Sequence, residues 1–198
     1  SKGFVLSSKT TPMSMIGDEP YQMKKKFPDV YVAVDKDRCN GIERITTMNE
    51  TKDTDVILLD DAYQHRYVKP GINILLVDYH RLLIYDKLLP AGRLREPKEG
   101  KKRADIVIIT KCPKELKPMD FRVIRKAMNL YPYQSLFFST LKYGNLKPAY
   151  CGEDRTLDSI RKEENILLLT GIASPKQILI DLQPYTDNIR SMSFPDHH

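Results

Sequence analysis

The sequence has few cysteines and no long apolar run. Cys39, Cys112 and Cys151 are widely spaced, odd in number and without a C-x-x-C pair. This pattern argues against a disulfide framework and a zinc site, and it favours reduced thiols in a cytosolic protein. No apolar stretch approaches the roughly 20 residues that span a bilayer, and no secretory signal opens the sequence. Any contact with a membrane is therefore expected to be peripheral.

Two nucleotide-binding motifs are also missing. Neither G-x-x-x-x-G-K-[ST] nor G-x-G-x-x-G occurs in the 198 residues. Both motifs bind phosphate groups through a glycine-rich loop at the start of a helix. A nucleotide site built from these residues is therefore incomplete, unless a phosphate loop lies upstream of Ser1.

The composition is that of an ordinary globular protein, with 41% hydrophobic and 29% charged residues. There are 32 basic and 26 acidic side chains, which gives a net charge of +6. An excess of positive charge suits an anionic partner such as a nucleotide, a phospholipid surface or a nucleic acid. The charge alone does not choose among these three.

Short apolar segments alternate with amphipathic ones along the chain. Strands are expected at 30–34, 56–59, 74–77, 106–109, 134–141, 166–171 and 189–194, and helices at 18–26, 41–49, 121–130 and 174–182. This alternation predicts an α/β fold with parallel strands and right-handed crossovers. Residues 1–16 are expected to form a loop, and Asp18 is a possible N-cap of the helix that follows. The polar stretch 144–155 is the best candidate for a domain boundary.

An acidic pair directly follows the apolar run 56–59, in the order Asp60-Asp61-Ala62-Tyr63-Gln64-His65. Ligands of open parallel sheets bind at the carboxyl ends of strands, and two adjacent carboxylates need solvent, a metal ion or a basic partner. Asp35 and Asp78 follow two other expected strands. Carboxylate oxygens are the ligands that magnesium prefers. A solvated loop is the alternative, but the second acidic strand end and the long loop 88–97 favour a magnesium or phosphate site.

The loop 88–97 carries Arg93, Arg95 and Glu96 between proline and glycine residues. Guanidinium groups bind phosphate with two hydrogen bonds at once, so two arginines near a metal site suit the binding of a nucleotide. The alternative is a solvated turn with internal ion pairs. The spacing does not decide whether His65 is a base or a structural residue.

Taken together, several motifs resemble those of the tetraacyldisaccharide 4′-kinase family, which phosphorylates a disaccharide lipid in lipid A biosynthesis. Their order and approximate spacing match over nearly the whole chain, and the loop 88–97 is the most specific of them. The motifs are Gly17-Asp18-Glu19-Pro20, Asp37-Arg38, Asp60-Asp61-Ala62-Tyr63-Gln64-His65, Leu88-Leu89-Pro90-Ala91-Gly92-Arg93-Leu94-Arg95-Glu96-Pro97, Arg103-Ala104-Asp105 and Phe194-Pro195-Asp196-His197.

The resemblance implies an α/β fold with a parallel-sheet, P-loop-kinase-like domain at 1–143, a linker at 144–157 and the start of a smaller α/β domain at 158–198. The first domain is expected to lack its N-terminal P-loop segment, so the 198 residues alone are expected to be nearly inactive. The implied reaction is ATP-dependent phosphorylation of the 4′-hydroxyl of a tetraacyldisaccharide 1-phosphate. The implied cofactors are ATP and Mg²⁺, and the implied place is the cytoplasmic face of the bacterial inner membrane, as a peripheral protein.

The resemblance also implies roles for particular residues. Asp60 and Asp61 are the expected magnesium residues, and Asp18 with His197 is expected to activate the sugar hydroxyl across a cleft between the domains. The expected substrate residues are Lys2, Phe4, Glu19 and Arg38, and the expected nucleotide residues are His65, Arg95 and Glu96. The family usually has Arg where Lys2 stands, Gly where Ala62 stands and a glycine-rich stretch where Tyr85-Asp86 stand.

Two other classes of protein are alternatives. A non-catalytic basic α/β module that binds nucleic acid predicts aromatic residues interleaved with a Lys/Arg patch, and the scattered tyrosines count against it. A metal-dependent sugar-nucleotide transferase could use Asp60 and Asp61 without any phosphate loop. The gene sequence upstream of Ser1 distinguishes this second alternative from a kinase.

Overall fold

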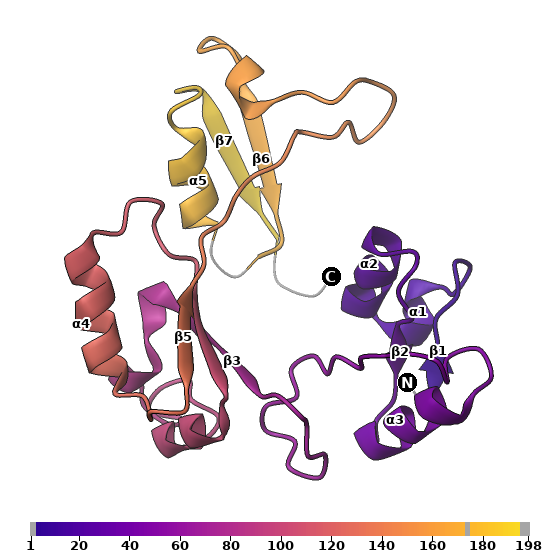
Figure 1. Cartoon of the computed structure of the whole chain (residues 1–198). Coiled ribbons are helices and arrows are strands. Elements are labelled where there is room, and N and C mark those ends of the chain that lie inside the picture. Colours follow the sequence, from indigo (N-terminus) through magenta and orange to yellow (C-terminus); the bar gives the residue numbers. More distant parts are fainter. Residues whose placement is uncertain (1–2, 173–174, 195–198) are drawn as a thin grey trace. The chain divides into compact units, whose positions relative to one another are not determined.

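The computed structural model describes residues 3–172 and 175–194 (Figure 1). The chain divides into two compact units, Ser1–Thr140 and Leu141–His198. Both units combine helices with parallel strands, which confirms the α/β class. Each unit is described by itself below.

The first unit opens with two short antiparallel strands and three helices. These are β1 (Val5–Leu6), α1 (Met13–Ile16), α2 (Asp18–Lys26), β2 (Ala33–Val34) and α3 (Arg38–Thr47), with β1 paired to β2. The loop prediction for 1–16 is therefore wrong, because this stretch contains β1 and α1. The predicted helix 18–26 is confirmed, but Gly17 is its N-cap residue and Asp18 its first helical residue.

The sequence accounts for the ends of α2 and α3. Asp18 and Glu19 lie in the first turn of α2 and three lysines in its last turn, which suits the partial charges at the two ends of a helix. In α3 the Asp37 carboxylate accepts hydrogen bonds from the backbone N–H groups of Cys39 (2.9 Å) and Asn40 (3.3 Å). This N-cap lets α3 begin at Arg38, three residues before the predicted start.

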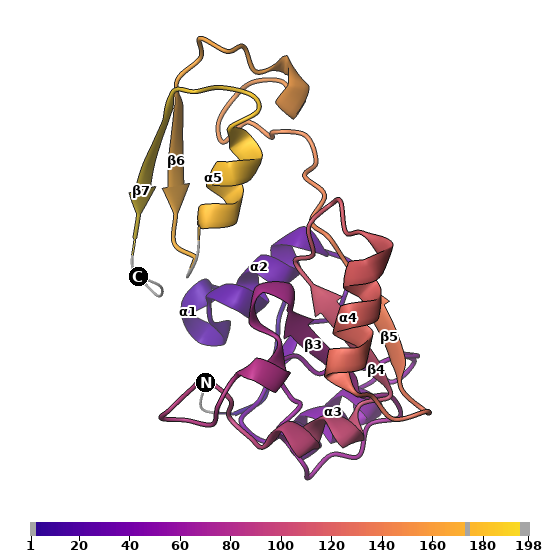
Figure 2. The same ribbon diagram turned by 90° about the vertical axis from the view of Figure 1, so that its left-hand side faces the viewer.

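The first unit also contains a three-stranded parallel sheet, with α4 (Pro118–Met128) beside it (Figure 2). Its order is β3 (Ile74–Asp78), β4 (Ile106–Thr110) and β5 (Ser135–Phe138), and α4 lies along one face. The strand predictions at 74–77 and 106–109 are confirmed. Short 3₁₀ helices occur at Tyr79–Arg81, Leu83–Tyr85, Lys98–Arg103 and, in the second unit, Leu157–Ser159.

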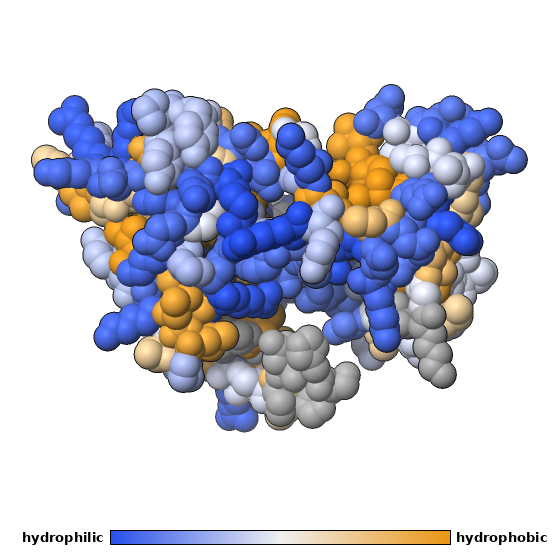
Figure 3. Space-filling view, turned by 90° about the horizontal axis from the view of Figure 1, so that it is seen from below, coloured by the Kyte–Doolittle hydropathy of each residue, from blue (hydrophilic) through white to orange (hydrophobic). Residues whose placement is uncertain are grey.

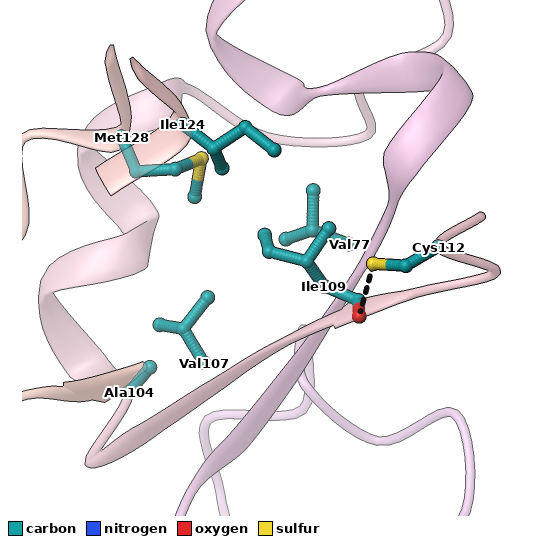
Figure 4. Packing of buried hydrophobic residues seen from close by; sticks show 7 residues of the cluster. All are labelled: Val77, Ala104, Val107, Ile109, Cys112, Ile124 and Met128. Carbon is teal, nitrogen blue, oxygen red and sulfur yellow. Dashed lines mark hydrogen bonds between the residues drawn. The ribbon is translucent and has the colours of Figure 1, made fainter. Parts of the chain in front are cut away.

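The hydrophobic core lies between this sheet and α4 (Figure 4). Val107, Ile109 and Met128 are completely buried there. On the other face of the sheet, Leu76 and Phe137 are 64% and 53% exposed. The alternation of buried and exposed residues along β3, β4 and β5 follows from the two-residue period of a strand.

Three of the predicted strands are wrong or too long. The predicted strand 134–141 is one of them, because β5 covers only Ser135–Phe138. Residues 56–59 form no strand, and Val56 and Leu58 are 67% and 87% exposed. Of the predicted strand 30–34, only Ala33–Val34 is a strand, and it pairs antiparallel with β1. An apolar run becomes a strand only when another strand satisfies its N–H and C=O groups. Among the described residues, 56–59 form no such ladder.

The second unit contains one strand–helix–strand element. It consists of β6 (Ile166–Thr170), α5 (Lys176–Leu182) and β7 (Ile189–Ser193), and the two strands are parallel. The predictions for 166–171 and 189–194 are confirmed to within one residue at each end. The helix prediction 174–182 is confirmed for 176–182, whereas residue 174, at its expected start, lies outside the described residues.

The surface shows polar and apolar residues side by side. Figure 3 shows hydrophobic residues in several separate patches among hydrophilic ones on the face that it displays. Within the described residues, no helix is both long enough and apolar enough to cross a bilayer. The three cysteines are all free thiols.

Candidate functional site

The aspartate pair lies in an exposed turn after the extended segment 56–59. The Asp60 carboxylate accepts a hydrogen bond of 3.0 Å from the backbone N–H of Asp61. Asp61 has a φ of +42°, in the left-handed region, which aspartate tolerates better than most residues. The turn therefore presents both carboxylates to solvent.

Arg95 contacts this turn from the loop 88–97. Its Nη1 lies 3.2 Å from Oδ1 and 3.0 Å from Oδ2 of Asp61. The side chains of Arg95 and Asp61 are 62% and 72% exposed. An exposed ion pair contributes at most about 1 kcal/mol, so a ligand can separate the two charges easily. The structure thus brings together an expected metal residue and an expected nucleotide residue that lie 34 positions apart in sequence.

Glu96 points away from solvent into a second set of contacts. Its two carboxylate oxygens lie 2.7 and 2.8 Å from Nη2 of Arg103, and Arg66 lies 3.5 Å away. The same Arg103 nitrogen donates to the Tyr63 carbonyl oxygen (3.2 Å), and the guanidinium lies over the Tyr63 ring at 4.7 Å. The Tyr63 hydroxyl donates to the Gly100 carbonyl oxygen (2.9 Å), and burial raises the pKa of that hydroxyl.

Sequence reasoning assigns no role to Arg103. It is the first residue of the motif Arg103-Ala104-Asp105, but nothing in its spacing connects it to both Glu96 and Tyr63. Asp105 has a separate role, because its carboxylate accepts a hydrogen bond of 2.7 Å from the backbone N–H of Asn73. The motif therefore joins several segments of the chain by side-chain contacts.

The loop 88–97 has its own internal support at Asp86. The Asp86 carboxylate accepts hydrogen bonds from Arg81 Nε (2.8 Å) and from the backbone N–H groups of Lys87 (2.8 Å) and Arg93 (3.2 Å). The bond from Arg81 is the main reason that the pKa of Asp86 lies below its ordinary value. Asp86, which stands where the family usually has a glycine-rich stretch, thus anchors the loop that presents Arg95.

Gly92 is required by a close approach inside this loop. A Cβ at Gly92 would lie 2.2 Å from the Lys87 carbonyl oxygen and 2.6 Å from Oδ1 of Asp86. Backbone hydrogen bonds close the loop here, from Gly92 to the Leu88 carbonyl (2.9 Å) and from Leu94 to the Lys87 carbonyl (3.0 Å). Any side chain at residue 92 must push these segments apart.

We therefore expect Gly92→Ala to open the loop locally. The backbone N–H groups of Gly92 and Leu94 should exchange with deuterium roughly tenfold faster or more. A loss of about 1.4 kcal/mol of local stability raises the exchange rate by a factor of about ten. Gly71→Ala is the matched control, because a Cβ at Gly71 meets nothing within 4 Å. Equal exchange in both variants would mean that the close approach at Gly92 does not support the loop.

Asp78 and Asp35 each have a local partner. Asp78 ends β3 and lies 2.7 Å from Lys111 Nζ, at the carboxyl end of β4. Partial burial opposes its ionisation, but hydrogen bonds from Lys111 and from the His80 N–H outweigh that effect and lower its pKa. The Asp35 carboxylate accepts from the Asp37 N–H (3.0 Å) and from Asn40 Nδ2 (2.5 Å), which shapes the turn before α3.

The donor set at the aspartate turn fits a magnesium ion in kind and number. Magnesium is usually held by one or two carboxylates together with waters and substrate phosphates. Asp60 and Asp61 supply two exposed carboxylates of this kind. In the part of the chain that the structure describes, no group of three or more His, Cys, Asp or Glu side chains forms a larger metal cluster.

The other expected site residues lie on different elements. Asp18 and Glu19 are exposed in the first turn of α2, and Arg38 is the half-buried first residue of α3. Phe4 is half-buried under the Arg44 guanidinium, 5.2 Å from its ring centre. His65 is exposed, and its backbone N–H donates to the Ala62 carbonyl oxygen (2.8 Å). Lys2 and His197 lie outside the described residues.

The fold and these contacts define the class of protein: an α/β protein with parallel sheets, in which an exposed aspartate turn meets an arginine-bearing loop. The family follows from comparison with known sequences. The model of the family described as tetraacyldisaccharide-1-P 4′-kinase matches residues 1–198, and the chain belongs to this family.

The relatives carry the same name. The chain is 60% identical to the tetraacyldisaccharide 4′-kinase of Phocaeicola vulgatus, 56% to that of Bacteroides fragilis strain ATCC 25285 and 54% to that of Bacteroides thetaiotaomicron. Each match covers 100% of this chain and 54% of the relative. The chain thus spans about half the length of the curated relatives that it matches. No solved structure matches it.

Proposed function

We propose that the gene product carrying this chain transfers the γ-phosphoryl group of ATP to the 4′-hydroxyl of a tetraacyldisaccharide 1-phosphate, in lipid A biosynthesis. The observation that carries this proposal is the family match over residues 1–198, together with relatives of the same name at 54–60% identity. The contact of the aspartate turn with Arg95 supports it, because phosphoryl transfer requires positive charge close to the transferring group.

We assign the nucleotide side of the reaction to the aspartate turn and the loop 88–97. Asp60 and Asp61 would hold Mg²⁺, which would neutralise negative charge on the phosphate oxygens. Arg95 then leaves Asp61 and binds a phosphate group of ATP. Because both side chains of this ion pair are exposed, separating them costs little free energy. Glu96 and His65 complete the nucleotide side.

We assign the lipid side to residues of the first helices and of the two chain ends. Asp18 and His197 together remove the proton from the 4′-hydroxyl, which is a poor nucleophile without a base. Lys2, Phe4, Glu19 and Arg38 bind the lipid substrate. The Arg44 guanidinium makes a cation–π contact with the Phe4 ring. The positive charge that this contact places beside Phe4 supports binding of an anionic lipid there.

We further propose that the β3-β4-β5 sheet belongs to a P-loop-kinase-like domain at 1–143, followed by a linker at 144–157 and a smaller α/β domain from 158. Finding a G-x-x-x-x-G-K-[ST] motif encoded upstream of Ser1 would support this proposal, and an upstream sequence without the motif would argue against it. The 198 residues alone are then nearly inactive. The protein acts as a peripheral protein at the cytoplasmic face of the inner membrane, and its partner is the lipid substrate rather than a nucleic acid.

The identity of the donor, ATP or a sugar nucleotide, tests the function. The full-length gene product is incubated with Mg²⁺, tetraacyldisaccharide 1-phosphate in mixed micelles and either γ-³²P-labelled ATP or a labelled sugar nucleotide. A kinase moves the label from ATP into the lipid and leaves the sugar nucleotide unchanged. Transfer from the sugar nucleotide, with none from ATP, would identify a sugar-nucleotide transferase and end the proposal.

A further inference from the structure

Arg103 connects three parts of the candidate site. Its guanidinium contacts the Glu96 carboxylate, the Tyr63 carbonyl oxygen and the face of the Tyr63 ring. We propose that Arg103 is a positioning residue for nucleotide binding, which fixes the loop 88–97 against the aspartate turn so that Arg95 and Asp61 are held at one place. This inference rests on the proposed function, since it concerns the nucleotide side of that reaction.

The burial of the Arg103–Glu96 pair makes it a stronger link than the Arg95–Asp61 pair. The side chains of Arg103 and Glu96 are 26% and 17% exposed, whereas those of Arg95 and Asp61 are 62% and 72% exposed. A partly buried carboxylate that loses its cation keeps the cost of burial without the compensating contact. The Arg103–Glu96 pair is therefore expected to stay intact when a ligand binds, whereas a ligand can replace the Arg95–Asp61 contact.

The neighbouring glycine shows how closely Glu96 is seated. A Cβ at Gly100 would lie 2.8 Å from both Cδ and Oε1 of Glu96. Gly100 is also the residue whose carbonyl oxygen accepts the hydrogen bond from the Tyr63 hydroxyl. Gly100, in the 3₁₀ helix Lys98–Arg103, thus leaves space for the Glu96 carboxylate, and its carbonyl oxygen also accepts the hydrogen bond from Tyr63.

The positions in sequence show what this arrangement controls. Glu96 directly follows Arg95, and Tyr63 follows Asp61 by two residues. Holding Glu96 and Tyr63 to one guanidinium therefore sets the distance between the backbones that carry Arg95 and Asp61. When a nucleotide separates these two side chains, their backbones stay in place.

A lysine cannot replace Arg103 in this role. The planar guanidinium presents several N–H donors and stacks on an aromatic face, whereas an ammonium group is a compact point charge. Lysine at 103 keeps the positive charge beside Glu96 but loses the simultaneous contact with the Tyr63 ring and carbonyl. The Arg103→Lys variant therefore separates positioning from charge.

The test compares Arg103→Lys and Arg103→Met in the full-length gene product, with Arg122→Met as the matched control. Arg122 is exposed on α4 and, among the described residues, has no ion pair. The first readout is hydrogen exchange of two backbone N–H groups without any ligand, His65 in the aspartate turn and Leu94 in the loop. The second is steady-state kinetics with KM for ATP, KM for lipid and kcat measured separately.

Both Arg103 variants are expected to exchange these two N–H groups faster and to raise KM for ATP roughly tenfold or more, since small displacements of positioning groups are costly. KM for lipid should change less than about twofold, and Arg122→Met should resemble the wild type. If exchange at His65 and Leu94 is unchanged, or KM for ATP and KM for lipid rise together, Arg103 is not a positioning residue. A wild-type protein without kinase activity would instead refute the proposed function, while the exchange measurement still tests the role of Arg103.

Discussion

Replacing Asp61 with alanine in the full-length gene product is expected to lower kcat by roughly two to three orders of magnitude. The reason is that Asp61 is one of two carboxylates assigned to Mg²⁺, and its loss weakens the neutralisation of charge on the transferring phosphoryl group. KM for the lipid should change less than about threefold, because an interaction made mainly in the transition state appears in kcat. The measurement is steady-state kinetics at saturating ATP and Mg²⁺.

The position of Asp61 makes this variant easy to interpret. Its side chain is 72% exposed and pairs only with the exposed Arg95 among the described residues, so the melting temperature should fall only slightly, chiefly because alanine tolerates the positive φ of residue 61 less well than aspartate does. Asp53→Ala is a suitable control, since Asp53 is also an exposed acid in a turn a few residues earlier. A variant that keeps its turnover and loses lipid affinity would assign the aspartate turn to another site.

The second large effect is expected at Asp18 and His197. A positioned base contributes roughly 10²–10⁴-fold to proton transfer, and residues that act as one unit are not additive. Asp18→Ala, His197→Ala and the double variant should therefore lose similar amounts of kcat. A carboxylate beside an imidazole can fix its tautomer and stabilise the charge that forms as the proton moves.

The alternative role of Asp18 predicts a different result. Asp18 is an exposed residue in the first turn of α2, where a negative charge stabilises a helix by about 0.3–1 kcal/mol. A residue with this role alone changes the melting temperature and leaves kcat almost unaltered. If the two rate losses multiply in the double variant, or if neither exceeds a few-fold, Asp18 and His197 do not act together.

The sheets were largely predictable from the sequence. The runs at 74–77, 106–109 and 166–171 became strands because each has a parallel neighbouring strand that satisfies its backbone groups. The equally apolar run 56–59 did not, because hydrophobicity cannot supply the neighbouring strand that its backbone needs. Local composition thus indicates which segments can form strands, and pairing decides which of them do.

The candidate site was predictable in its residues but not in its contacts. The family motifs named Asp61, Arg95 and Glu96, yet no pattern indicated that Arg95 and Glu96, adjacent in sequence, face different partners. Arg103 was missed because its role depends on a meeting of three segments, which a sequence period does not record. The anchoring of the loop by Asp86 was missed for the same reason.

Phosphorylation at the 4′ position can be read from the product of the reaction. The full-length gene product is incubated with ATP, Mg²⁺ and tetraacyldisaccharide 1-phosphate, and the lipid is analysed by ³¹P NMR with proton correlation. We expect a second phosphate monoester whose phosphorus couples to the proton on carbon 4′, absent when ATP is omitted and strongly reduced with Asp61→Ala. A lipid that keeps its single phosphate, or one phosphorylated at another hydroxyl, would contradict it.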